Sequence, residues 1–377
     1  MEQPLGIAPA RSEGEARFAV VPWRAFTDRS GWDALAGRAA EPNPFAERWC
    51  AEAGLAEFGD QSRAELACLT IDGALAGILP LVRRRRYERY PLPHIGNWLH
   101  ANAFCGAPLV AGGHEHRFWR ELLGWADRNG GMALFLHLEQ LPADGPLYAA
   151  LRDVCAVEQR PAAEVQRIER ARLASELAPQ AYFEASLSGK KRKELRRQHT
   201  RLAEHGTIGF ERQVDGADLA SWAQAFLELE RAGWKGREGS ALACDPAKAA
   251  FFRSALAGAA EHDRLERLAI TLDGQPIAML ANFVTPPAVY SFKTAYDERF
   301  ARFSPGVLLQ RENLDLLARG DIAWADSCAA ADHPMIERIW REKRPMVRVS
   351  VAIGGPLRRA AASALLRVET RGKLKEL

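Results

Sequence analysis

Residues 66–81 read LACLTIDGALAGILPL, and residues 268–280 read LAITLDGQPIAML. The two apolar runs share a Thr-Ile/Leu-Asp-Gly core although they lie far apart in the chain. Asp-Gly between β-rich runs is typical of a hairpin, because a type I′ turn needs φ > 0 at both central residues. Each run therefore predicts a strand, a tight turn and a second strand.

A second pair of segments repeats a longer pattern at a similar offset. Residues 133–154, ALFLHLEQLPADGPLYAALRDV, predict a strand, a loop and a helix, and residues 322–340, IAWADSCAAADHPMIERIW, repeat that order. Because order and spacing agree, the chain is predicted to hold two copies of one α/β unit in tandem. Function then lies between the copies or in one of them.

The composition predicts a soluble protein of two domains. The 377 residues are 47% hydrophobic and 26% charged, with no apolar run of membrane-spanning length. The N-terminus lacks the pattern of a signal peptide, so a cytoplasmic location is expected. The six cysteines form no CxxC pair and are expected to be free thiols. Because the formal charge is only +3, electrostatic function must come from local clusters.

Five segments are predicted along the chain. Residues 1–17 are expected to be disordered, 18–160 to form a first domain, 161–182 to link the halves, 183–355 to form a second domain, and 356–377 to be a basic tail. The second domain is expected to open with a basic, serine-capped helix over 188–201.

The stretch Ser304-Pro305-Gly306 lies where a predicted strand gives way to a helix. Free N–H groups and the positive end of the helix dipole can hold a phosphate there, and Arg302 adds charge. Proline and glycine are also common at the start of a helix that binds no ligand, so this alternative interpretation stays open.

Four segments of the second half carry a family pattern: F-x-x-S-L-S-G-K-K-R-K-E-L-R-R-x-x-x-R-L-x-x-x-G (183–206), L-E-x-x-G-W-K-G-R-E-G (229–239), L-D-G-x-P-I-A (272–278) and Y-D-E-R-F-A-R-F-S-P-G-V-L-L (296–309). They resemble GNAT-fold acyltransferases of the CelD-like or BioF-like group, relatives of the Fem-type peptidoglycan aminoacyltransferases, which are two GNAT units in tandem. The resemblance implies an α/β fold with two mixed central sheets flanked by helices, the first unit being degenerate.

The resemblance also implies where an acyl thioester binds. The sheet of the second unit is expected to split between two strands around the pantetheine arm, with the pyrophosphate on the loop formed by Arg302, Phe303, Ser304, Pro305, Gly306 and Val307. Of the usual GNAT loop pattern only Gly306 and either Arg302 or, by register, Phe303 are kept. Acyl-CoA or an acyl carrier protein thioester is therefore the expected co-substrate, with an aminoacyl-tRNA ester as a further donor and no permanently bound cofactor.

Direct attack of an amine on a thioester needs a base for the amine proton. His333 is the first candidate, because its ordinary pKa suits proton transfer near neutrality, and Asp326 is the second. The sequence Asp332-His333-Pro334 is equally compatible with a helix-capping turn.

Several other residues are predicted to contact substrates. By resemblance, Arg192 or Lys193 on the basic helix contacts the acceptor's phosphate, although such a charge run is usually a solvated face. Trp234, Lys235 and Arg237 suit a lid over a polar substrate, and Lys293 and Tyr296 lie on the strand beside the thioester channel.

Two other clusters, one of arginines and one of histidines, suggest a membrane contact and no metal site. Residues 83–86, four arginines after the first hairpin, suggest a docking face for anionic headgroups at the inner membrane face, rather than a nucleic-acid site. His114 and His116 point apart on a helix, so no metal is expected.

The sequence as a whole predicts an N-acyltransferase acting on a small-molecule or lipid-linked amine of a cell-envelope precursor. An amino sugar of a polysaccharide and an amino lipid such as a sphingoid base both fit. Fem-type aminoacyl transfer to a peptidoglycan precursor and a non-catalytic binding module of the same fold are the alternatives.

Overall fold

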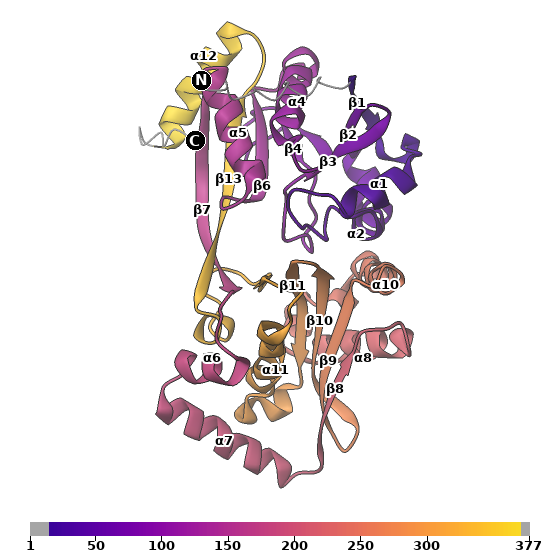
Figure 1. The fold of residues 1–377 in the computed structure, drawn as a ribbon, viewed down its shortest axis with the longest axis vertical. Coiled ribbons are helices and arrows are strands. Elements are labelled where there is room, and N and C mark those ends of the chain that lie inside the picture. The colour runs from indigo at the N-terminus through magenta and orange to yellow at the C-terminus, as the bar shows by residue number, and fades with distance from the viewer. Residues whose placement is uncertain (1–14, 371–377) are drawn as a thin grey trace, which may run out of the picture.

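The computed structural model describes residues 15–370 and contains one continuous mixed sheet (Figure 1). The strand order is β1-β2-β3-β4-β6-β13-β7-β12-β11-β10-β9-β8, and β5 pairs with β3 outside this path. The α/β tandem fold is confirmed, but the two expected sheets are joined into one. The predicted disordered segment 1–17 lies outside the described residues except for its last three, two of which begin β1.

The first half contains the elements from β1 to α5. Its strands are β1 (Ala16–Pro22), β2 (Glu65–Ile71), β3 (Ala74–Arg84), β4 (His94–Asn97), β5 (Leu109–Val110) and β6 (Phe135–Pro142). Its helices are α1 (Arg29–Ala36), α2 (Arg48–Gly54), α3 (Asp60–Ser62), α4 (Glu115–Asn129) and α5 (Pro146–Val157).

The second half repeats this layout. Its strands are β8 (Ile208–Gln213), β9 (Leu265–Leu272), β10 (Gln275–Thr285), β11 (Ala288–Tyr296) and β12 (Trp324–Asp326). Its helices are α6 (Pro179–Ser186), α7 (Gly189–Ala203), α8 (Leu219–Ala232), α9 (Trp234–Arg237), α10 (Pro246–Glu261) and α11 (Pro305–Asn313). The strands β7 (Ala162–Leu173) and β13 (Glu342–Ala352) and the helix α12 (Pro356–Glu369) complete the fold.

Both predicted hairpins are confirmed, with turns of the expected type. β2 pairs with β3 through Ile71 and Ala74, and β9 pairs with β10 through Leu272 and Gln275. Asp72-Gly73 has φ values of 48° and 81°, and Asp273-Gly274 has 49° and 77°. Two consecutive positive φ values define the type I′ turn, so the duplicated Asp-Gly pair sets the same register in both halves.

The segment 161–182, expected to be a linker, is instead mainly the strand β7. This strand pairs along its length with β13, which is inserted between β6 and β7 and so lies inside the sheet of the first half. Figure 1 shows β7 and β13 running together from one half into the other. At its end Arg172 is opposite Glu342 on one side and Asp326 on the other. The charged sequence of β7 hid the strand, since its stability comes from these partners.

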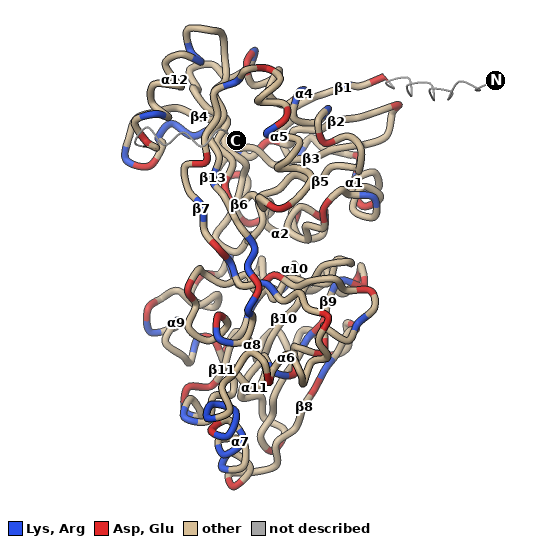
Figure 2. Tube along the Cα trace, turned by 60° about the vertical axis from the view of Figure 1, so that its left-hand side comes forward, with Lys and Arg blue, Asp and Glu red and all other residues tan. Residues whose placement is uncertain are grey.

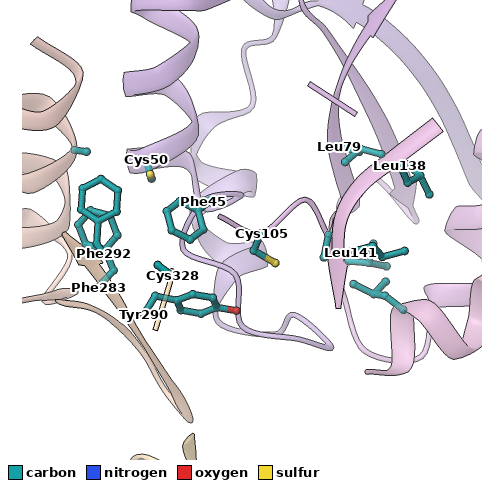
Figure 3. Close-up of a cluster of buried hydrophobic side chains, with 14 of the residues drawn as sticks. Phe45, Cys50, Leu79, Cys105, Leu138, Leu141, Phe283, Tyr290, Phe292 and Cys328 are labelled. Carbon is teal, nitrogen blue, oxygen red and sulfur yellow. The ribbon is translucent and has the colours of Figure 1, made fainter. Parts of the chain in front are cut away.

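One hydrophobic core crosses the junction of the halves. Phe45, from the segment before α2, lies among Phe283, Tyr290 and Phe292 of the second half (Figure 3). Its ring centroid is 5.6 Å from that of Tyr290 and 6.1 Å from that of Phe292. Aromatic pairs of this kind add about 0.5–1.5 kcal/mol each beyond area burial, so the halves are held together by packing as well as by shared strands.

Two local predictions differ from the structure. Residues 333–340, expected to be a helix by analogy with α5, form turns and one short 3-10 turn, Ile336–Arg338. The glycine-rich loop 233–239 contains the helical turn α9. The basic tail begins with α12, which packs on β7 and β13, while residues 371–377 lie outside the described part. The domain boundaries at 18–160 and 183–355 stay predictions.

Candidate functional site

The sheet of the second half splits between β11 and β12. The two strands pair in parallel only through Ala288–Tyr290 and Trp324–Asp326, after which they diverge. A bulge on β11 places Phe292 as an extra residue opposite β10, and such a bulge bends and twists the strand. No strand among the described residues pairs with 291–296 on the side facing away from β10. This unpaired edge can accept an extended ligand through backbone hydrogen bonds.

The predicted phosphate loop, Arg302–Val307, lies at the start of α11 but is partly covered. An added Cβ at Gly306 would lie 2.9 Å from the sulfur of Met335 and 3.6 Å from Cδ1 of Tyr296, so a larger residue there would have to displace the Met335 side chain. The amides of Val307 and Leu308 both donate to the carbonyl of Ser304. Few N–H groups of the first turn are therefore left for an anion, and side chains must supply most of the charge.

Other residues of this loop are placed as follows. Pro305 and Gly306 are buried, and Phe303 packs in the core beneath the helix. The guanidinium of Arg302 lies 4.7 Å from the ring centroid of Phe303 and 3.3 Å from Nε2 of His205. Arg302 is exposed, so it remains available to an anion at the surface.

A basic pocket of about 230 Å³ adjoins the start of α11. It is lined by Phe183, Arg192, Leu195, Arg196, His199, Thr200, Val307, Leu308 and Arg311. Arg192 is 3.4 Å from the carboxylate of Glu184, and Arg311 lies 5.4 Å above the ring of Phe183. The structure thus brings Arg192 together with Val307, although the two were expected to bind the acceptor's phosphate and the donor's, respectively. Lys193 on the same helix is exposed outside the pocket.

Lys293 on β11 faces the first half across the split. Its ammonium lies 5.1 Å from the ring centroid of Phe104 and 5.7 Å from that of Phe292. Burial lowers the pKa of Lys293 to about 8, with a smaller contribution from the charge of Lys235. Burial, followed by the charge of Lys293, lowers the pKa of His100 to about 3. Phe104 and His100 were missed by the sequence reasoning, because nothing in the local pattern shows what the first half presents to the second.

His333 lies in the loop that follows β12 and shares a neighbour with Lys293. Its side chain is half-buried, and Nδ1 has no hydrogen-bond partner among the described residues. Burial lowers the pKa of His333, and Lys235 lowers it further. The imidazole is therefore neutral at pH 7, which is the form that accepts a proton.

The turn α9 is held in place rather than free. The Trp234 amide donates to Glu298 Oε1 at 2.6 Å, and Arg237 Nη2 lies 2.8 Å from Oε2 of the same carboxylate. Lys235 pairs at 2.7 Å with Glu230, whose side chain is 3% exposed. Trp234 is 45% exposed, so it presents an aromatic face beside the split from a fixed backbone.

Asp326 is placed where it cannot easily accept a substrate proton. Its side chain is fully buried and lies 3.3 Å from Arg170 Nη1 and 3.1 Å from Arg344 Nη1. It also accepts the Cys328 amide at 2.8 Å. Two guanidinium groups and an amide occupy the carboxylate, which favours a structural role at the junction of β7, β12 and β13.

The corresponding split in the first half is closed. β4 and β6 pair in parallel through His94–Gly96, and Asn97 then bridges the gap by accepting from the Glu139 amide and donating to the Glu139 carbonyl, both at 2.9 Å. Gly106 fills the remaining space, since an added Cβ would lie 2.0 Å from the Glu139 carbonyl oxygen. A pantetheine arm cannot enter here, so the two halves share a scaffold but differ in this feature.

The arginines after the first hairpin line a groove of about 800 Å³ at the far end of the first half from the β11/β12 split. Arg83 pairs with Glu65 at 3.2 Å, whereas Arg84 and Arg85 have no ion pair among residues 15–370. Met132, 82% exposed, lines the same groove.

Neither a membrane-spanning helix nor a metal-binding cluster occurs among the described residues. No helix there is long and apolar enough to cross a membrane. Likewise, within residues 15–370 no group of three or more His, Cys, Asp or Glu side chains is arranged to hold a metal ion.

One family model matches part of the sequence. Residues 189–333 match the family model described as "Acetyltransferase (GNAT) domain", a span that includes the basic helix, the split strands, α11 and His333. No curated protein matches the sequence significantly.

Solved structures with low sequence identity share the fold. FemX aligns with a TM-score of 0.54 and 11% identity over 89% of this chain and 99% of its own. A conserved protein of unknown function from Bacteroides thetaiotaomicron aligns with a TM-score of 0.55 and 11% identity over 89% and 100%. The C-terminal domain of a putative lysylphosphatidylglycerol synthetase from Agrobacterium fabrum aligns with a TM-score of 0.51 and 13% identity over 91% and 98%.

The expectations of a GNAT-like fold and of an acyltransferase are thereby confirmed, while the CelD-like or BioF-like subgroup stays a prediction. Residues 189–333 thus match the GNAT acetyltransferase family model, and the chain as a whole has a mixed α/β, GNAT-like fold.

Proposed function

We propose that the protein transfers an acyl group from a thioester donor to the amine of an envelope precursor, as CelD-like or BioF-like acyltransferases are expected to do. The observation that carries this proposal is the unpaired edge of β11 in the half that matches the acetyltransferase model, combined with the closed split of the first half. One donor site per chain follows.

The donor arm would lie along residues 291–296 and enter between β11 and β12. Its phosphate would bind in the basic pocket through Arg192, Arg196 and Arg311, with Arg302 nearby at the surface. Guanidinium groups suit this task because they present several donors to phosphate oxygens. Acyl-CoA and an acylated carrier protein both carry such an arm.

The reaction would be a direct displacement. The amine nitrogen attacks the thioester carbonyl carbon and forms a C–N bond, and the C–S bond breaks as the tetrahedral intermediate collapses. His333, neutral at pH 7, would take the amine proton. Lys293, with a pKa of about 8, would be mostly protonated at pH 7 and would give a proton to the departing thiolate.

The acceptor would approach from the junction of the halves, where Lys293 of the second half faces Phe104 of the first. Trp234, Lys235 and Tyr296 would then be its further contacts. An amino sugar and an amino lipid both remain acceptors under this proposal. FemX and the lysylphosphatidylglycerol synthetase domain share the fold, which keeps aminoacyl transfer as an alternative. Contact of the arginine groove with an anionic membrane would hold the protein at the membrane surface, but the groove lies away from the split and would not itself position a lipid-linked acceptor there.

Thiol release tests the proposal. The purified protein would be mixed with acetyl-CoA, palmitoyl-CoA or palmitoylated carrier protein and with glucosamine or sphinganine as acceptor. Thiol release that requires both donor and amine, with the N-acyl product identified by mass spectrometry, is expected. If no donor is turned over with any amine while a donor still binds, the protein is a binding module rather than an enzyme.

A further inference from the structure

The helix α7 has a cationic face that no part of the described chain covers. Lys190, Lys193, Arg197 and Arg201 are exposed and follow the spacing i, i+3, i+7, i+11, which places them on one side of a helix. Among residues 15–370 none of the four has an ion pair or a side-chain hydrogen bond. Figure 2 shows the blue of α7 gathered at the end of the second half. We call these four residues the α7 stripe.

Other cations of α7 are engaged and do not belong to the stripe. Lys191 pairs with Glu194 at 3.1 Å, and Arg192 pairs with Glu184 at 3.4 Å. Glu184 and Glu194 are thus already paired, and only Glu204 at the end of α7 lies close to the stripe in sequence, so the stripe keeps a net positive charge. Four uncompensated cations along about 16 Å of helix, at 1.5 Å per residue, form a linear electropositive surface.

The neighbouring face of α7 lines the basic pocket at the start of α11, since Arg196 and Thr200 follow Lys193 by three and seven residues. Arg192, Arg196 and His199 reach that pocket together with Val307 of α11. A ligand bound on the stripe would therefore lie next to the pocket assigned to the donor phosphate and next to the end of β11. This arrangement suits a partner that brings its own phosphate-bearing arm.

We propose that the α7 stripe docks the acidic helix of an acyl carrier protein, whose phosphopantetheine phosphate enters the basic pocket. This inference rests on the proposed function, and it names the donor as a protein-bound thioester. An anionic membrane fits less well, because the apolar side chains Leu195 and Leu202 of α7 are 3% and 0% exposed and give nothing to insert into a bilayer.

Charge neutralisation on the stripe tests the docking. The variant Arg197→Gln/Arg201→Gln removes two stripe charges without touching the pocket, and Arg231→Gln/Arg253→Gln removes two exposed arginines from α8 and α10 as a matched control. Kd for acylated carrier protein would be measured by titration, and KM and kcat would be measured with both the carrier donor and palmitoyl-CoA. Circular dichroism would confirm that both variants are folded.

The stripe variant is expected to raise Kd and KM for the carrier donor about tenfold, with kcat and the palmitoyl-CoA KM unchanged. The control variant should match the wild type, and added salt should weaken carrier binding to the wild type more than to the stripe variant. Unchanged carrier affinity in the stripe variant, or turnover of palmitoyl-CoA alone, would overturn the docking while leaving acyl transfer intact. A loss of binding to phosphatidylglycerol vesicles instead of to the carrier would assign the stripe to lipid. Stripe-dependent carrier binding without turnover of either donor would support the docking and overturn the proposed function.

Discussion

Replacing Asp326 by asparagine tests whether this residue holds the halves together or takes part in the chemistry. The substitution keeps the shape but removes the charge opposite Arg170 and Arg344, whose side chains are 2% and 4% exposed. Breaking a buried pair by removing one partner costs about 3–5 kcal/mol, because the remaining charge stays buried without compensation. This is a large part of the roughly 5–15 kcal/mol that stabilises a typical domain.

The assay is urea unfolding, followed by tryptophan fluorescence and by circular dichroism. With a dependence on urea of about 3 kcal/mol per molar, the midpoint of Asp326→Asn should fall by about 1–2 M. Asp321→Asn is the matched control, since Asp321 pairs with Arg319 at 2.7 Å but is 52% exposed. Its cost should stay below about 1 kcal/mol.

The result that refutes the structural role is specific. If Asp326→Asn unfolds at the wild-type urea concentration and yet loses turnover, the carboxylate acts on the substrate. If turnover falls only in proportion to the folded fraction, the role of Asp326 is structural and His333 remains the candidate base.

Three other substitutions test the site. His333→Ala should lower turnover about a hundredfold with donor affinity intact. Because the pKa of His333 is lowered from the ordinary value near 6.5, wild-type kcat should be constant at neutral pH and fall only on the acid side of that value. A kcat that rises through pH 8 would contradict the assignment. Lys293→Met should raise the free energy of unfolding by roughly 1–3 kcal/mol at pH 7, because the folded protein must bury a charged ammonium group whose pKa is lowered to about 8. In urea unfolding this gain should shrink as the pH rises from 8 to 10. The same substitution should slow thiol release, and an unchanged rate would remove Lys293 from the chemistry. Gly106→Ala should destabilise the protein by about 1–3 kcal/mol in the same assay, since the new Cβ meets the Glu139 carbonyl, and a wild-type midpoint would show that the first-half split can open.

The local features of the fold could be predicted from the sequence. The two Asp-Gly hairpins and the serine-capped helix α7 form as predicted, because each depends on turn chemistry or a cap within a few residues. The strand β7 was missed because its partners are β13 and β12, far away in the chain, and its own residues alternate without a clear apolar face.

For the candidate site, too, features that depend on residues far apart in the chain could not be predicted. Arg192, Lys235, Lys293 and His333 were predicted from basic or polar segments, and their roles stay predictions. In the structure, the charge of Lys235 lowers the pKa of both Lys293 and His333. The role of Asp326 could not be read from its neighbours in sequence, because the two arginines that occupy it come from β7 and β13. The closure of the first-half split by Asn97 was equally invisible, since it depends on a contact with Glu139 on another strand.

The position of β13 has a consequence for how the chain folds during synthesis. Residues 342–352 lie between β6 and β7, so the sheet of the first half has a gap until almost the whole chain has left the ribosome. Until then β6 and β7 have unpaired edges, and contacts of such long sequence separation form slowly. The first half should therefore stay protease-sensitive in nascent chains that stop before residue 342, and the last strand acts as the element that completes both halves at once.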